Sequence, residues 1–107
     1  MPKFLTIGYG DQEGYDRTPD GVRAAAHELD AKLIEDGAIV GIASAPVQVR
    51  NPDAVSVETR AGQFMKSDLP VAGFAIIEAD SIEDAIEKVA GVPCAVAHGV
   101  VEVWQMG

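Results

Sequence analysis

The sequence predicts an α+β fold in which an antiparallel sheet carries two helices on one face, the ferredoxin-like or split βαβ arrangement. Three observations support this prediction. Residues 71–79 (VAGFAIIEA) form an apolar segment with no polar face, which is typical of an inner strand. Residues 19–36 and 81–90 have helical periodicity, and each lies between two strand-like segments. The whole chain therefore reads strand, helix, strand, hairpin, strand, helix, strand.

Length, charge and cysteine content restrict the class of protein. A chain of 107 residues supports one core, so we expect a single domain over residues 1–107. The net charge of −9, with basic residues spread along the chain, disfavours nucleic acid and anionic membranes as partners. No apolar run approaches the ~20 residues needed to cross a bilayer. Cys94 is alone and no export signal is evident, so we expect a cytoplasmic protein.

The first half of the chain predicts a strand, a loop and a long helix. The strand covers residues 4–10, and residues 11–17 read as a polar loop. Thr18-Pro19-Asp20 predicts a helix start, with a hydroxyl N-cap, proline at the first helical position and a carboxylate at the positive end of the dipole. The helix should end before Gly37. Its apolar stripe, expected to face the sheet, is Val22, Ala25, Ala26, Leu29 and Leu33.

The second half predicts a hairpin, an inner strand, a helix and a last strand. Residues 38–43 are apolar on both faces, and residues 47–50 and 55–60 alternate around an Asn-Pro-Asp turn, which predicts a hairpin. Residues 61–70 look irregular, and the inner strand of residues 71–79 follows. Asp80 to Asp84 fit a capping box, so a helix is expected from residue 81 to Gly91. The last strand covers residues 100–106 and puts Trp104 and Met106 on one face.

The apolar strands predict a homodimer. Two helices cover only one face of the sheet, and the two-sided strands leave the other face apolar. An uncovered apolar face of this size is unstable in a monomer, so we expect two chains to pack sheet against sheet. A hairpin that wraps the partner is compatible with this arrangement, but the sequence does not require it.

Residues 61–78 (AGQFMKSDLPVAGFAIIE) resemble the signature of the YCII-related superfamily, in its DGPF (DGPFAETKE) branch. The matching residues are Gly62, Phe64, Gly73, Phe74 and Glu78. Ala61 and Gln63 replace the Asp and Pro of the signature, and the charges that follow also differ. The resemblance implies a dimeric α+β barrel with a cleft between helix, sheet and partner. Most of that family has no assigned reaction; a few relatives are lyase or isomerase-type enzymes acting on ring compounds, and some place a His on the first helix beside an acidic residue.

His27, on the first helix, is the first candidate catalytic residue. It lies off the apolar stripe, and Asp30 follows three residues later, where it could hold a ring nitrogen and raise the pKa of the histidine. The pair could then move a proton on a ligand. The alternative is a half-exposed histidine with a surface ion-pair partner. Asp36 is the other acidic candidate, because the C-terminal end of a helix disfavours a carboxylate.

Tyr9 and Phe64 are candidates for ligand binding, with core or interface packing as the alternative for both. His98 reads as a surface loop residue and Cys94 as a buried, inert thiol. The histidines and the cysteine lack the spacing of zinc motifs, and no phosphate-binding loop is present, so we predict no metal and no cofactor.

Two functions remain open at this point. The first is a small enzyme in which His27 and an acidic neighbour shuttle a proton on a small organic ligand. The second is a non-catalytic dimeric module that binds a ligand or a protein partner. The missing Asp and Pro of the signature turn, and the lack of a clear catalytic triad, favour the second slightly. We therefore expect a ligand-binding protein in which enzyme activity has yet to be demonstrated.

Overall fold

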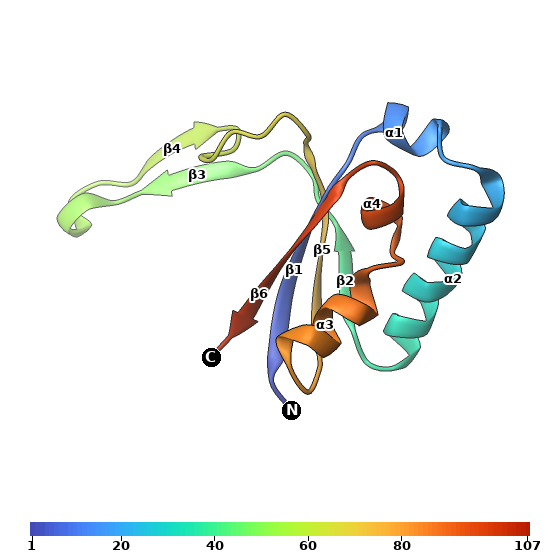
Figure 1. The fold of residues 1–107 in the computed structure, drawn as a ribbon. Coiled ribbons are helices and arrows are strands. Elements are labelled where there is room, and N and C mark those ends of the chain that lie inside the picture. The colour runs from blue at the N-terminus through green and yellow to red at the C-terminus, as the bar shows by residue number, and fades with distance from the viewer.

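The computed structural model describes residues 1–107 as an α+β fold with a four-stranded antiparallel sheet, a two-stranded sheet and four helices (Figure 1). The main sheet contains β1 (Lys3–Tyr9), β2 (Ile39–Ile42), β5 (Val71–Glu78) and β6 (Val100–Met106). The small sheet contains β3 (Val47–Arg50) and β4 (Glu58–Ala61), joined through a 3₁₀ turn, η1 (Pro52–Ala54). The helices are α1 (Gln12–Asp16), α2 (Asp20–Glu35), α3 (Ile82–Val89) and α4 (Pro93–Val96).

The strand order of the main sheet is β2-β5-β1-β6, and every neighbouring pair is antiparallel. As a consequence β1 and β2 run parallel to each other and are connected through α1 and α2. In the same way β5 and β6 run parallel and are connected through α3 and α4. The helices lie on one side of the main sheet (Figure 1). The prediction that residues 71–79 form an inner strand is confirmed, because β5 pairs on both edges.

The capping predictions were right for one long helix and wrong for the other. At α3, Ser81 Oγ accepts a hydrogen bond from the Asp84 amide at 3.1 Å, and the Asp84 carboxylate accepts from the Asp80 amide at 2.9 Å. At α2 the predicted cap Thr18 is turned away, and the hydroxyl donates instead to the Gly14 carbonyl at 2.7 Å. The reason is α1, which occupies residues predicted as loop: its last carbonyls need donors, and Thr18 supplies one.

The buried core lies between the sheet and α3. It consists of Phe4, Ile77, Ala79, Ala85 and Val89. Helix α2 adds only Ala26 to the buried residues, and its predicted apolar stripe was partly wrong, since Val22 is 42% exposed. Ala26, Leu29 and Leu33 face inward as predicted, but Arg23 and Asp30 are half-buried beside them. Glycine and alanine form the sheet surface beneath α2, and they leave a space that the helix does not fill.

The sheet face opposite the helices is bare in the single chain. The apolar residues of this open face are Leu5, Ile7, Ile39, Phe74, Ile76, Val100, Trp104 and Met106, and the same face also carries Lys3, Tyr9, Glu78 and Glu102. Ile39 is 69% exposed, Trp104 57% and Phe74 46%. Only ten of the 107 residues are buried, because half of the apolar sheet has nothing packed over it.

Residues 46–66 form an arm that projects from the body (Figure 1). The predicted hairpin is confirmed, although its second strand starts at Glu58 instead of Val55. No residue of the arm is buried. The radius of gyration is 15.7 Å, whereas a compact chain of this length has about 13 Å. The arm accounts for the extended shape.

Candidate functional site

The space between α2 and the sheet is a cavity of about 410 Å³, which we call the α2 cavity. Its floor is made by residues of the sheet, many of them small: Gly8, Gly41, Ala72, Gly73 and Ala75, together with Thr6, Val40, Ile42, Phe74 and Val101. Helices α2 and α4 supply the opposite wall, with His27, Asp30, Pro93 and Cys94. The volume falls in the range of about 300–1,000 Å³ that is usual for ligand pockets. The predominantly apolar lining with a few polar groups is also typical of such pockets.

His27 and Asp30, the two residues that the helix spacing singled out, both line the α2 cavity. The expected hydrogen bond between them is not formed, because His27 Nε2 pairs with the Tyr15 hydroxyl instead. His27 is exposed and so lies at the mouth of the cavity, whereas Asp30 is half-buried. Burial raises the pKa of Asp30 above its ordinary value, and the positive charge of His27 partly opposes this rise. A carboxyl with a raised pKa can hold or release a proton closer to neutral pH than an exposed aspartate.

Tyr15 fixes the orientation of His27. The Tyr15 hydroxyl lies 2.8 Å from His27 Nε2, and the two rings meet edge to face with centroids 5.8 Å apart. Tyr15 also contacts Arg23, whose guanidinium lies over the Tyr15 ring at 4.9 Å from its centroid. When the Tyr15 hydroxyl donates to Nε2, neutral His27 carries its proton on Nδ1. The sequence did not point to Tyr15, because its helix α1 was predicted as a loop.

Cys94 also lines the α2 cavity, and it is packed tightly against β1. A Cβ atom on Gly8 would lie 2.9 Å from Cys94 Sγ, so only glycine leaves room for the sulfur at this point of the strand. Burial raises the pKa of the Cys94 thiol, and the negative charge of Asp30 raises it further. The group is therefore a neutral thiol at pH 7, which does not favour a role as nucleophile.

The other predicted site residues lie elsewhere. The Tyr9 hydroxyl donates to Glu102 Oε1 at 2.6 Å, and this hydrogen bond is the main cause of the raised pKa of Tyr9. Asp36 follows the last turn of α2, beside a separate hollow of about 130 Å³. Phe64 lies at the base of the arm and is 76% exposed. None of these three residues lines the α2 cavity.

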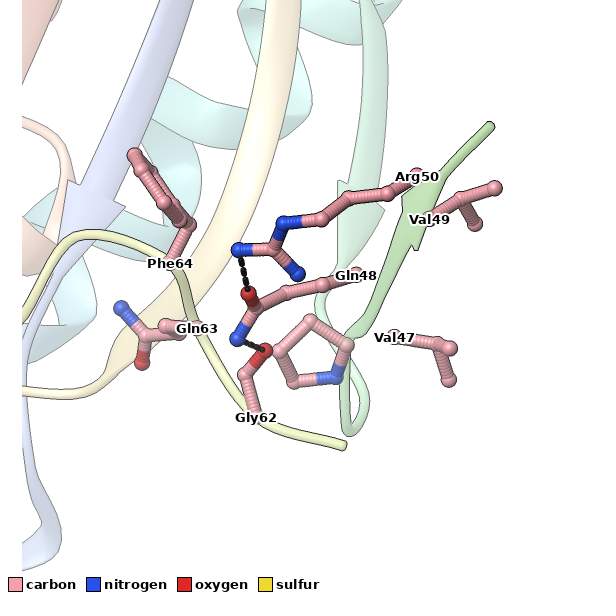
Figure 2. Close-up of a pocket in the computed structure, with 8 residues that line it drawn as sticks. Val47, Gln48, Val49, Arg50, Gly62, Gln63 and Phe64 are labelled. Atoms are coloured by element: carbon pink, nitrogen blue, oxygen red, sulfur yellow. Dashed lines mark hydrogen bonds between the residues drawn. The ribbon is translucent and has the colours of Figure 1, made fainter. Parts of the chain in front are cut away.

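A second hollow, of about 400 Å³, lies at the base of the arm (Figure 2). Its polar groups are bonded to one another: Gln48 Nε2 donates to the Gly62 carbonyl at 3.1 Å, and Arg50 Nη2 donates to Gln48 Oε1 at 3.1 Å. The Arg50 guanidinium also lies 5.6 Å from the centroid of the Phe64 ring. This hollow contains no acid–base pair, so the α2 cavity remains the candidate functional site.

Comparison with known proteins does not assign the chain to a family, since no family model matches it and no match to a curated protein was found. No three or more His, Cys, Asp or Glu side chains are grouped so that they could hold a metal ion. None of the helices has the length and apolar character needed to cross a bilayer.

Replacing Asp30 by asparagine is expected to stabilise the protein at pH 7 and not at low pH. Because the folded-state pKa of Asp30 is raised, its contribution to stability is present below the unfolded pKa and is lost as the pH rises through the folded pKa. The Asp30→Asn variant cannot ionise, so its melting temperature should exceed that of the wild type at pH 7, and the two should converge at about pH 3. A wild type that melts higher at pH 7 would show instead that a His27–Asp30 ion pair outweighs burial.

Proposed function

We propose that the protein binds a small organic molecule in the α2 cavity and that His27 and Asp30 exchange a proton with its polar group. One observation carries this proposal: the same cavity of ligand size is lined by both titratable side chains and by a largely apolar sheet surface. The apolar surface suits a ring or a short apolar chain. The two titratable groups at the opposite wall suit a hydroxyl or a carboxyl group on the ligand.

The chemistry that fits these residues is proton transfer. The Tyr15 hydroxyl orients the His27 ring. Burial raises the pKa of Asp30, so this carboxyl binds a proton more tightly than an exposed carboxylate does. A carboxyl whose pKa is raised toward the working pH is better suited to a general acid or base role than an exposed one. The resemblance to the YCII-related superfamily supports the same function, because some of those relatives place a His on the first helix beside an acidic residue. Lyase and isomerase reactions commonly use proton transfer of this kind.

We further propose that the molecule is a ferredoxin-like homodimer of the dimeric α+β barrel type. The strand order β2-β5-β1-β6 with two helical crossovers supports the fold. The bare open face supports the dimer, because side chains such as Trp104 and Phe74 are about half-exposed in one chain and would be covered by a second.

Thermal-shift screening with phenols and small carboxylic acids tests the ligand site. A ligand present at 100 times its dissociation constant stabilises the folded state by about 2.7 kcal/mol, which is on the order of 10 °C for a chain of this size. His27→Ala should lose most of this shift, and Tyr15→Phe should reduce it, since it frees the His27 ring. His98→Ala is the matched control, because His98 is exposed and lies outside the α2 cavity. An equal shift in the wild type and in His27→Ala would rule out this site.

A different observation favours the alternative of a non-catalytic dimeric regulatory or interaction module. Many exposed apolar side chains gather on the open face and on the arm, away from the α2 cavity. Incubating each ligand that shifts the melting temperature with the protein, followed by product analysis, separates the two functions. A ligand that binds and is recovered unchanged would support the binding module.

A further inference from the structure

The arm has one apolar side that nothing in its own chain covers. Val47 and Val49 are 62% and 67% exposed, and both point away from the polar side chains of Gln48 and Arg50 (Figure 2). Thr59 and Ala61 lie across from the two valines on β4 and so share their side of the hairpin. An isolated two-stranded hairpin is only marginally stable in water. An arm of this kind therefore needs a surface to pack against.

The charge of the arm differs in sign from that of the rest of the protein. Residues 46–66 contain three basic residues (Arg50, Arg60 and Lys66) and two acidic ones, a net charge of +1. The remainder of the chain contains five basic and fifteen acidic residues, a net charge of −10. The arm is thus complementary in charge to the body of a second copy of the same chain.

The position of the arm fits such a partner. It leaves the main sheet on the side opposite the helices (Figure 1), which is the side of the open face. A protomer seated on the open face would therefore lie beside the arm. Specific interfaces involve about 20–30 residues on each side, and the open face alone supplies fewer, so the arm would complete the contact.

We propose that in the homodimer each arm clasps the partner protomer, with its valine side against the partner and its basic residues near the partner's acidic surface. In a two-fold dimer the contact is reciprocal, so both arms are covered at once. This inference rests on the homodimer in the proposed function, but it assigns the arm a role that a flat sheet-to-sheet dimer does not need.

The contact between each arm and the partner, the clasp, is tested by amide hydrogen exchange of the wild-type chain. Exchange and the mass in solution are measured at the same series of protein concentrations. Backbone amides of residues 47–61 should be protected where the mass is that of a dimer and should lose protection on dilution to the monomer. The double variant Val47→Thr/Val49→Thr keeps the shape of both side chains and should weaken dimerisation at least tenfold. The matched control is Val22→Thr/Ile34→Thr, at exposed apolar positions on α2, which should leave dimerisation unchanged.

The possible results distinguish the proposed arm contact, the clasp, from the proposed dimer itself. A dimer whose arm amides exchange freely would overturn the clasp and leave the dimer standing. A monomer at all concentrations would overturn both. Protected arm amides in the monomer, or an unchanged dissociation constant in Val47→Thr/Val49→Thr, would also overturn the clasp, because the arm would then be ordered without the partner.

Discussion

Replacing Trp104 by lysine is expected to convert the proposed dimer to a monomer at micromolar concentrations. Trp104 lies on the open face opposite Leu5 of β1 and is 57% exposed in the single chain. A buried interface tryptophan contributes about 2 kcal/mol or more, and a two-fold interface contains it twice. A loss of about 4 kcal/mol corresponds to a dissociation constant weaker by roughly 1,000-fold. Sedimentation equilibrium measures this change directly.

Ile34→Lys is the control for the Trp104 variant. Ile34 is 53% exposed, close to the value for Trp104, but it lies on α2 in the helix layer. The two variants add the same charge to apolar positions of similar exposure, and only the one on the open face should change the mass. Circular dichroism should show that both chains remain folded. If both variants stay dimeric, the dimer interface lies on another surface. If the wild type is a monomer, the open face does not bind a second copy of the chain.

The elements that the sequence predicted correctly are those with strong local signals. The inner strand β5 follows from an uninterrupted apolar run, and α3 follows from Ser81 and Asp84 at capping-box spacing. The short helices α1 and α4 have only weak local signals, a cap by Asp11 that accepts from the Gly14 amide and a proline, Pro93, at the start of α4. They also depend on contacts with each other. Gly14, in the middle of α1, approaches the Ala97 carbonyl so closely that a Cβ atom would lie 2.5 Å from it. A close approach of this kind depends on tertiary packing, which the local sequence does not encode.

The candidate site was predictable only where its residues are close in the chain. The spacing of His27 and Asp30 placed them together on α2, and both line the α2 cavity. The cavity itself arises because residues such as Gly8 and Gly73, from distant strands, lie side by side in the sheet. Periodicity alone treats such small residues as part of an ordinary packed face, so it included Val22 and Ala25 in the α2 stripe, although both are exposed.

Truncating the two phenylalanines on opposite faces of the sheet is expected to have unlike consequences. Phe4 is fully buried under the helices, so Phe4→Ala should lower the free energy of unfolding by about 3–5 kcal/mol. Phe74 is 46% exposed in the single chain, so its removal leaves no cavity there. Phe74→Ala should therefore act mainly on the proposed dimer, by weakening the association of the two chains. The same chemical change thus probes the core in one case and the interface in the other.

The Trp104→Lys background separates these two effects. In this monomeric chain, urea unfolding should retain most of the loss caused by Phe4→Ala, while Phe74→Ala should cost less than about 1 kcal/mol, as is usual for a surface substitution. In the wild-type background both substitutions should lower the stability, because there Phe74 would be covered by the partner. Equal losses from Phe4→Ala and Phe74→Ala in the monomeric chain would mean that a single chain already covers both faces. The open face would then not require a second copy of the chain to cover it. The arm would in that case have no partner protomer to contact.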